Sequence, residues 1–215
     1  MTLFVLTNEI MRGKDLYRIL MNEACSAVEL RGKVLDIGGG AGRPSYFRFF
    51  KQDGKISITS VDALMEGESR VDFEKDRLPF ADASVDTALL LNVLEHVYRY
   101  EHLLADTYRV LRKSARLIGV VPFLVNYHPD PRDFWRYTGD SIEQMLKKTG
   151  FTGVKIDTFG WGPCTAGFYQ IEFLIPRIFR VFAVPSVYIL DKILFWFRPE
   201  LTRRFPLGYF FTAIK

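Results

Sequence analysis

A glycine-rich turn in the first third of the chain is the first segment whose residue types could do chemistry. It reads VLDIGGGAGRPS and places Gly38, Gly40 and Gly42 directly after a short apolar run. Glycines at such a turn let the backbone approach a ligand closely and adopt positive φ. A pyrophosphate-binding GxGxxG turn would need a later glycine where Arg43 stands, and Asp36 would repel a phosphate. We therefore interpret the turn as a site for a ligand that carries an ammonium group.

Three further polar positions follow apolar runs of strand length. Asp62 ends the run ITSV, and an acid at the carboxyl end of a second strand suits the two hydroxyls of a ribose. A solvated loop aspartate is the alternative for this residue. Asp72 and Phe73 offer an acid and an apolar ring, which suit the amine and the face of an adenine. Asn92 begins the turn after the run VDTALLL.

A second polar cluster occupies residues 121–140, VPFLVNYHPDPRDFWRYTGD. Its ionisable and aromatic side chains are His128, Asp130, Asp133, Trp135, Arg136 and Tyr137. His128 has the type and position of a general base for an acceptor hydroxyl, with His96 as a second candidate. The alternative is that the segment shapes a loop and His128 is solvated. Asp133 and Arg136 are expected to pair with each other or with the loop backbone, or to contact substrate with Trp135 and Tyr137.

The elements that must position these residues alternate between strand-like and helix-like segments. Helices are predicted over 15–29, 44–50, 98–112 and 138–148, and strands over 33–37, 56–61, 71–73, 85–91, 116–122, 154–158 and 208–214. Such alternation predicts a doubly wound α/β sheet, in which ligands bind at the carboxyl ends of the strands. With 215 residues, the chain is expected to form a single domain over 1–215.

An aromatic segment over 160–206 separates the last two predicted strands. The net charge of +4 resides in the last quarter of the chain, where residues 161–215 hold seven Lys or Arg and three acids. The longest uncharged run, 181–190, contains Pro185 and is too short to span a membrane. We expect two helices that form a lid over the acceptor, a dimer contact, or a surface that meets anionic lipid through Arg177, Arg180, Lys192, Arg198, Arg203 and Arg204.

Four motifs in this order and spacing, VLDIGGGAG, SVDA, the LPF-D-SVD segment and LNVLEHV, resemble class I S-adenosylmethionine-dependent methyltransferases. The resemblance covers residues 30–122 and is strongest to the type 11 subgroup, which includes quinone-biosynthesis methyltransferases. It implies a Rossmann-like seven-stranded sheet with an antiparallel last strand and S-adenosylmethionine as cofactor. By the same resemblance, the methionine moiety is framed by Asp36, Gly38, Gly40 and Gly42, the ribose is held by Asp62, the adenine by Asp72 and Phe73, and the sulfonium lies beside Asn92.

The resemblance also implies what this protein does not do. No (Asp/Asn)-Pro-Pro-aromatic motif follows the fourth strand, which argues against methylation of nucleic acid. Some quinone methyltransferases hold a metal with an acid three residues before a Glu-His pair; Asn92 stands there in this chain, so no metal is expected.

The segments HPDPRDFWRYT and FPLGYFFTAIK resemble enzymes of bacterial cell-surface polysaccharide biosynthesis. They predict O-methylation of a sugar hydroxyl in a glycan or a lipid-linked intermediate. The alternatives are a methyltransferase for a small molecule (a quinone, polyketide or amine) and a non-catalytic subunit that binds S-adenosylmethionine. Two distant cysteines and no signal-peptide pattern predict a cytoplasmic protein, peripheral to the inner membrane face if the basic segment meets lipid.

Overall fold

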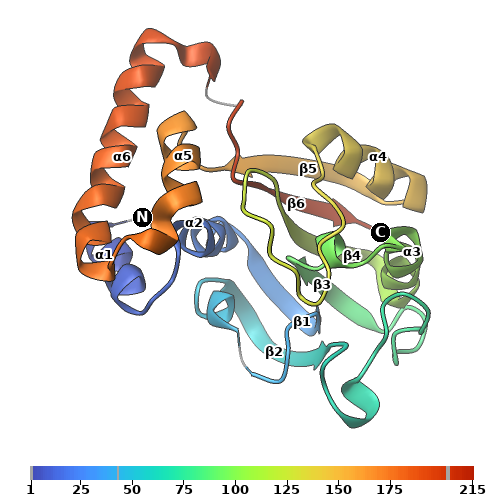
Figure 1. Cartoon of the computed structure of the whole chain (residues 1–215). Coiled ribbons are helices and arrows are strands. Elements are labelled where there is room, and N and C mark those ends of the chain that lie inside the picture. The colour runs from blue at the N-terminus through green and yellow to red at the C-terminus, as the bar shows by residue number, and fades with distance from the viewer. Residues whose placement is uncertain (1, 43, 202–203) are drawn as a thin grey trace.

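The computed structural model describes residues 2–42, 44–201 and 204–215. Its centre is a six-stranded sheet with the strand order β2-β1-β3-β4-β6-β5 (Figure 1). The strands are β1 (Glu29–Ile37), β2 (Lys51–Val61), β3 (Val85–Leu91), β4 (Leu111–Pro122), β5 (Thr152–Phe159) and β6 (Gly208–Ile214). β1, β2, β3 and β4 run parallel to one another, and β6 is antiparallel to both β4 and β5. The doubly wound, Rossmann-like α/β fold with an antiparallel last strand is confirmed.

The count of seven strands is wrong by one, because residues 71–73 form no strand. An isolated parallel bridge joins Asp62 to Arg70, and the chain then turns. The Asp72 carboxylate accepts a hydrogen bond from the backbone N–H of Glu74 at 3.0 Å, which favours a turn over continued pairing. Residues 44–50 likewise form only a short 3₁₀ turn (Ser45–Arg48) in place of the expected helix.

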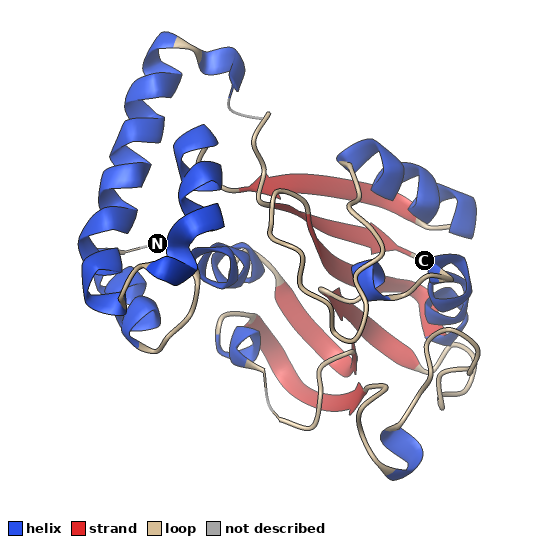
Figure 2. Ribbon diagram, viewed as in Figure 1, coloured by secondary structure: helices blue, strands red, loops and turns tan. Residues whose placement is uncertain are grey.

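Helices cover both faces of the sheet (Figure 2). α3 (Tyr100–Val110) and α4 (Gly139–Thr149) pack on one face, and α2 (Leu16–Cys25) packs on the other. In β3, Ala88 and Leu90 lie in the first core while Leu89 and Leu91 lie in the second. Successive side chains of a strand point to opposite faces, so the run is buried on both sides, as its continuous apolar character predicts.

The insertion before β6 consists of two helices. α5 (Pro163–Ile171) is followed by α6 (Arg177–Phe197), which continues through Pro185. α6 projects beyond the sheet, and α1 (Leu3–Met11), which the sequence did not predict, packs against it (Figure 1). Among the described residues, no helix is long and apolar enough to cross a membrane.

Two buried carboxylates hold the insertion together and attach it to the rest of the protein. Asp191 of α6 accepts hydrogen bonds from the backbone N–H groups of Cys164 and Thr165, both at 2.9 Å, and so caps the start of α5. Glu172 accepts a hydrogen bond from the N–H of Leu16 at 2.9 Å and pairs with Arg180 at 3.2 Å. The insertion is therefore anchored at the start of α2.

Candidate active site

A hollow of about 590 Å³ opens at the carboxyl ends of β1, β2 and β3. Parallel strands bring the turns that follow them to one edge of the sheet. Five of the eight residues predicted for the cofactor line this hollow, namely Gly38, Asp62, Asp72, Phe73 and Asn92. A larger hollow of about 830 Å³ lies over β5 and β6 and contains none of the predicted site residues.

The glycine turn after β1 requires glycine for two separate reasons. Gly38 and Gly40 have φ values of +80° and +67°, which L side chains rarely adopt. A Cβ on Gly38 would also stand 2.4 Å from the Val93 side chain. The Gly40 N–H donates a hydrogen bond to the Asp62 carboxylate at 3.1 Å, which joins the first turn to the second. Gly42 is exposed and lies outside the hollow.

Asp36 lies beneath the glycine turn and does not line the hollow. It is fully buried, and the Tyr46 hydroxyl donates to its carboxylate, 2.8 Å from each oxygen. Burial raises the pKa of Asp36 to about 6. A Cβ on Gly39 would stand 1.9 Å from the nearer Asp36 oxygen, so the carboxylate is in direct contact with the turn. Asp36 therefore supports the glycine turn from beneath.

Asn92 is held in place by α2. Its φ of +58° is a left-handed conformation, which asparagine tolerates better than most residues. The Tyr17 hydroxyl donates a hydrogen bond to the Asn92 side-chain oxygen at 2.6 Å, and the Asn92 amide lies 3.5 Å from the Met21 sulfur. Sequence reasoning missed Tyr17, because nothing near it in the chain marks it as part of the site.

The loop between β4 and α4 forms the opposite wall of the hollow. Asp130, Pro131, Arg132 and Phe134 line it, together with His96 and Tyr98. The predicted Trp135 and Tyr137 do not. The Trp135 indole N–H donates to the Val97 carbonyl at 3.2 Å, and the Tyr137 hydroxyl donates to the Leu94 carbonyl at 3.2 Å. These two side chains therefore attach the loop to the segment after β3, and their aromatic neighbour Phe134 faces the hollow.

Asp133 and Arg136 pair with each other, as one of the sequence alternatives predicts. The Asp133 side chain is 1% exposed, and the Arg136 guanidinium donates to it at 2.7 Å. The same carboxylate accepts the backbone N–H of His128 at 3.0 Å. These neighbours hold the pKa of Asp133 below its usual value, despite the opposing effect of burial. The ion pair thus fixes the position of His128.

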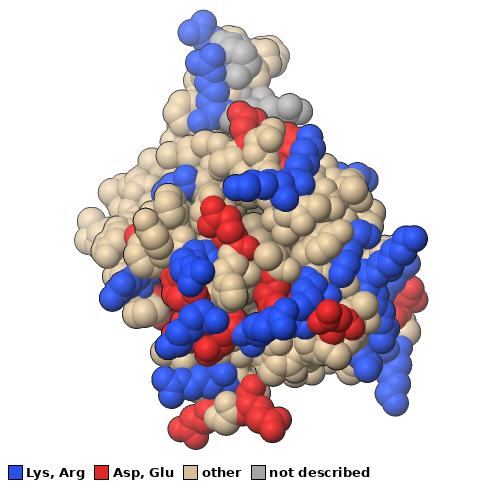
Figure 3. Space-filling view, turned by 90° about the vertical axis from the view of Figure 1, so that its right-hand side faces the viewer, with Lys and Arg blue, Asp and Glu red and all other residues tan. Residues whose placement is uncertain are grey.

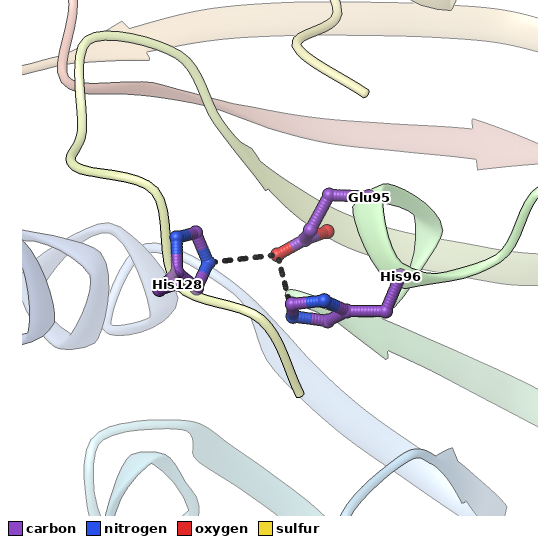
Figure 4. A group of neighbouring side chains, drawn as sticks. All are labelled: Glu95, His96 and His128. Atoms are coloured by element: carbon purple, nitrogen blue, oxygen red, sulfur yellow. Dashed lines mark ion pairs between the residues drawn. The ribbon is translucent and has the colours of Figure 1, made fainter. Parts of the chain in front are cut away.

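His128, His96 and Glu95 come together at this wall (Figure 4). The Nε2 atoms of His96 and His128 lie 3.8 and 3.9 Å from one oxygen of Glu95. The Glu95 carboxylate raises the pKa of His128. One donor atom from each residue lies within 4.8 Å of the others, so the three could hold a metal ion. The motif LEHV contains Glu95, but the sequence analysis treated this residue only as the neighbour of His96 and gave it no role of its own.

Comparison with known proteins places this geometry in context. A methyltransferase domain family matches residues 14–156. The chain is 27% identical over 176 residues to the ubiquinone/menaquinone biosynthesis C-methyltransferase UbiE of Cereibacter sphaeroides, across 60% of this chain and 70% of that protein. It is 32% identical over 108 residues to paromamine 6'-oxidase of Streptomyces fradiae, across 43% of this chain and only 20% of that protein.

Among solved structures, the chain resembles a SAM dependent methyltransferase from Archaeoglobus fulgidus. The TM-score is 0.52 at 16% sequence identity, and the match covers 100% of this chain and 95% of that one. At this identity the likeness concerns the fold.

Proposed function

This chain belongs to the methyltransferase domain family, and we propose that it methylates a sugar hydroxyl of a glycan or of a lipid-linked intermediate. The protein is an S-adenosylmethionine-dependent methyltransferase, so the methyl donor follows from family and fold. What we propose is the identity of the acceptor, the residues that bind the cofactor and the residues that bind the acceptor.

For the cofactor, we propose the arrangement that the motifs predict. Asp62 binds the ribose hydroxyls, Asp72 and Phe73 the adenine, and Asn92 lies near the sulfonium. All four line one hollow. The Asp62 oxygens already accept the N–H groups of Gly40 and Leu64, but a carboxylate oxygen can accept a second hydrogen bond.

The observation that carries the hydroxyl acceptor is the cluster of Glu95, His96 and His128 beside Asn92. In methyl transfer to an alcohol, an oxygen lone pair forms the new O–CH₃ bond, the C–S bond breaks, and S-adenosylhomocysteine leaves. The hydroxyl must also lose its proton, which needs a group positioned within reach. His96 lines the hollow. His128 lies behind it and contacts the His96 ring edge-on, with ring centroids 5.3 Å apart. We therefore keep both histidines as catalytic residues.

The rim of the hollow supports a sugar as acceptor. It offers Glu74, Arg99, Asp130 and Arg132, whose groups can bond to several hydroxyls. Tyr98 and Phe134 face the same space, and their rings lie 5.4 Å apart. Apolar ring faces beside polar groups suit a molecule with C–H faces and hydroxyl edges.

The acceptor can be tested with S-adenosylmethionine labelled in its methyl group and extracts of glycans, lipid-linked saccharides and quinones. We expect label in a saccharide fraction, released as methyl iodide by hydriodic acid, because this reagent cleaves methyl ethers. Label confined to quinones and resistant to hydriodic acid would instead support C-methylation of a small molecule, as named for the relative from Cereibacter. Cofactor binding with no transfer to any fraction would favour the non-catalytic subunit.

We further propose that α6 brings the enzyme to an anionic membrane surface, where a lipid-linked acceptor would reside. Exposed apolar residues recur at helical spacing along α6, at Ile178, Phe182, Ile189, Ile193 and Trp196. Trp196 is 81% exposed and Phe182 is 71% exposed. Arg177, Lys192 and Arg204 are exposed on the same insertion, whereas Arg203 lies outside the described residues.

Two features favour this surface over a lid. Of the described residues that line the cofactor hollow, none belongs to α5 or α6. Figure 3 shows acidic and basic side chains mixed over the body of the molecule and basic side chains on the projecting end. Apolar and basic residues together suit the interface of an anionic bilayer.

Sedimentation with phosphatidylglycerol vesicles tests the membrane proposal. We expect binding that weakens with salt and with the double variant Phe182→Ser, Trp196→Ser. The control Ile214→Ser, which changes an exposed apolar residue on β6, should bind like wild type. Equal binding to neutral vesicles, or a concentration-dependent dimer lost in the double variant, would assign this surface to another role.

A further inference from the structure

Glu95 presents a buried carboxylate that lies 3.8 and 3.9 Å from the Nε2 atoms of His96 and His128, beyond hydrogen-bond distance. The side chain is 0% exposed, and neither of its oxygens has a hydrogen-bond partner among the described residues. Arg136 of the adjoining loop is already paired with Asp133. A carboxylate buried without a partner is strongly unfavourable, so its presence points to a cation that the site receives.

The two histidines present matching donor atoms to this carboxylate. The His96 Nδ1 lies 2.6 Å from the Arg132 carbonyl, and the His128 Nδ1 lies 2.8 Å from the Asn126 carbonyl. A carbonyl only accepts hydrogen bonds, so in each neutral ring Nδ1 carries the hydrogen and Nε2 keeps its lone pair. In each ring, the nitrogen that is paired with Glu95 is therefore the one that keeps its lone pair. Metal-binding histidines are held in this way, with the other ring nitrogen donating to a carbonyl.

We infer that Glu95, His96 and His128 form a binding site for one divalent transition-metal ion. The three donor atoms lie within 4.8 Å of one another, and small side-chain rotations would bring each to about 2.0–2.2 Å from a shared ion. Two imidazoles and one carboxylate suit Zn²⁺, Co²⁺, Mn²⁺ or Fe²⁺ better than Mg²⁺ or Ca²⁺, which prefer oxygen ligands. His96 lines the hollow, so an ion held by this residue would lie beside the space that we propose for the acceptor.

This inference rests on the proposed function and specifies its proton step. An acceptor hydroxyl bound to the ion has a lowered pKa and releases its proton to solvent. The resulting alkoxide attacks the methyl carbon, the C–S bond breaks with its electron pair remaining on sulfur, and S-adenosylhomocysteine leaves. His128 then serves as a ligand, in place of the base role that its sequence position predicts.

The sequence argument against a metal considered only the position three residues before Glu95, where Asn92 stands. The structure shows that a third ligand can come from elsewhere. His128 lies on the loop after β4, 32 residues beyond His96 in the chain, and Asp133 holds it at Glu95. The predicted absence of a metal is therefore replaced by this inference.

Metal titration of the full chain, purified without a polyhistidine tag and stripped with a chelator, tests the site. We expect one Co²⁺ per chain by calorimetry, with visible absorption bands of a nitrogen–oxygen site that Zn²⁺ abolishes. Glu95→Gln, His96→Asn and His128→Asn should each weaken binding by at least about 100-fold, since even changes around a metal's ligands cost 10–100-fold. His102→Asn is the matched control, because His102 contacts the Asp76 carbonyl outside the cluster, and it should bind like wild type.

Three results would overturn the inference. One is no Co²⁺ or Zn²⁺ bound at millimolar concentration. Another is binding that His128→Asn leaves unchanged, and the third is an equal loss in His102→Asn, which would indicate adventitious surface binding. Because His128 is half-exposed on a loop, its variant should keep the circular dichroism of wild type even where Glu95→Gln does not fold. Methyl transfer to saccharide by metal-free protein would refute the ion and leave the function intact. Stoichiometric metal binding with label only in quinones would support the metal site and contradict the proposed sugar acceptor.

Discussion

Replacing Asp36 by asparagine should stabilise the cofactor-free protein at neutral pH. Asp36 is fully buried, and burial raises its pKa from 3.8 to about 6. One pKa unit corresponds to about 1.4 kcal/mol, so the ionised carboxylate destabilises the fold by about 3 kcal/mol relative to the unfolded chain. Asparagine keeps the shape and carries no charge, and its oxygen can still accept from Tyr46.

The pH dependence follows from the direction of the shift. Below about pH 4 the carboxyl is neutral in both the folded and the unfolded chain, and it has no electrostatic cost. As pH rises from about 4 to 6, the unfolded chain ionises first, so the folded state loses stability; above that range the full cost remains. The gain from Asp36→Asn should therefore be about 2–3 kcal/mol near pH 7.5 and about half as large near pH 5.

Urea unfolding followed by tryptophan fluorescence measures this difference at both pH values. Tyr46→Phe is the companion variant: it removes the hydroxyl that donates to Asp36, so it should destabilise wild type more than it destabilises the asparagine variant. With saturating S-adenosylhomocysteine, the stability difference between the asparagine variant and wild type should shrink or change sign if the Asp36 carboxylate attracts the ammonium group of the ligand, as the sequence predicts. A gain that does not change with pH, or an asparagine variant less stable than wild type near pH 7.5, would refute the reasoning.

Three other changes probe separate parts of the molecule. Asp62→Asn should weaken S-adenosylhomocysteine binding about 10-fold by calorimetry, because it removes a charged acceptor worth roughly 1.5–3 kcal/mol; exposed Asp53→Asn should not. His128→Asn should lower kcat about 100-fold in steady-state kinetics while cofactor affinity stays within a few-fold, and a parallel loss of cofactor affinity would contradict its acceptor-side role. Asp191→Asn should lower the free energy of unfolding by about 2 kcal/mol, because one oxygen that accepts from Thr165 is replaced by a donor; an unchanged urea midpoint would contradict this.

Strands and helices were predictable from the sequence where the local hydrophobic pattern reflects burial. The run over 85–91 is apolar on both faces because it packs into two cores, and the helix predicted over 138–148 is present as α4, with Thr138 as its cap and the left-handed Gly150 at its end. The sequence was a poor guide for segments whose structure depends on tertiary contacts. Three residues, 71–73, could not show whether a neighbouring strand would pair with them. Pro185 reads as a break in isolation, yet α6 continues through it toward Asp191, which ties α6 to α5.

The convergence of the residues that we propose for the cofactor was predictable for a topological reason, and that of the residues that we propose for the acceptor was not. Asp62, Asp72 and Asn92 each follow an apolar run, so placing the runs side by side brings them to one edge. Glu95 and His128 have no such relation, because a loop of irregular backbone brings them together. A glutamate is usually exposed, and Glu95 stands out only because it is buried with no hydrogen-bond partner among the residues that the structure describes.

The two halves of the site therefore depend on different parts of the protein. On the cofactor side, the turns after β1, β2 and β3 are fixed by the sheet itself and by the bond between Asp62 and Gly40. The acceptor side depends on the loop after β4, which Asp133, Arg136 and the Trp135 indole attach to the segment after β3. Loosening that loop should move His128 away from Glu95 while the cofactor turns stay in place. Acceptor choice can thus change through substitutions between β4 and α4 without loss of the methyl donor site.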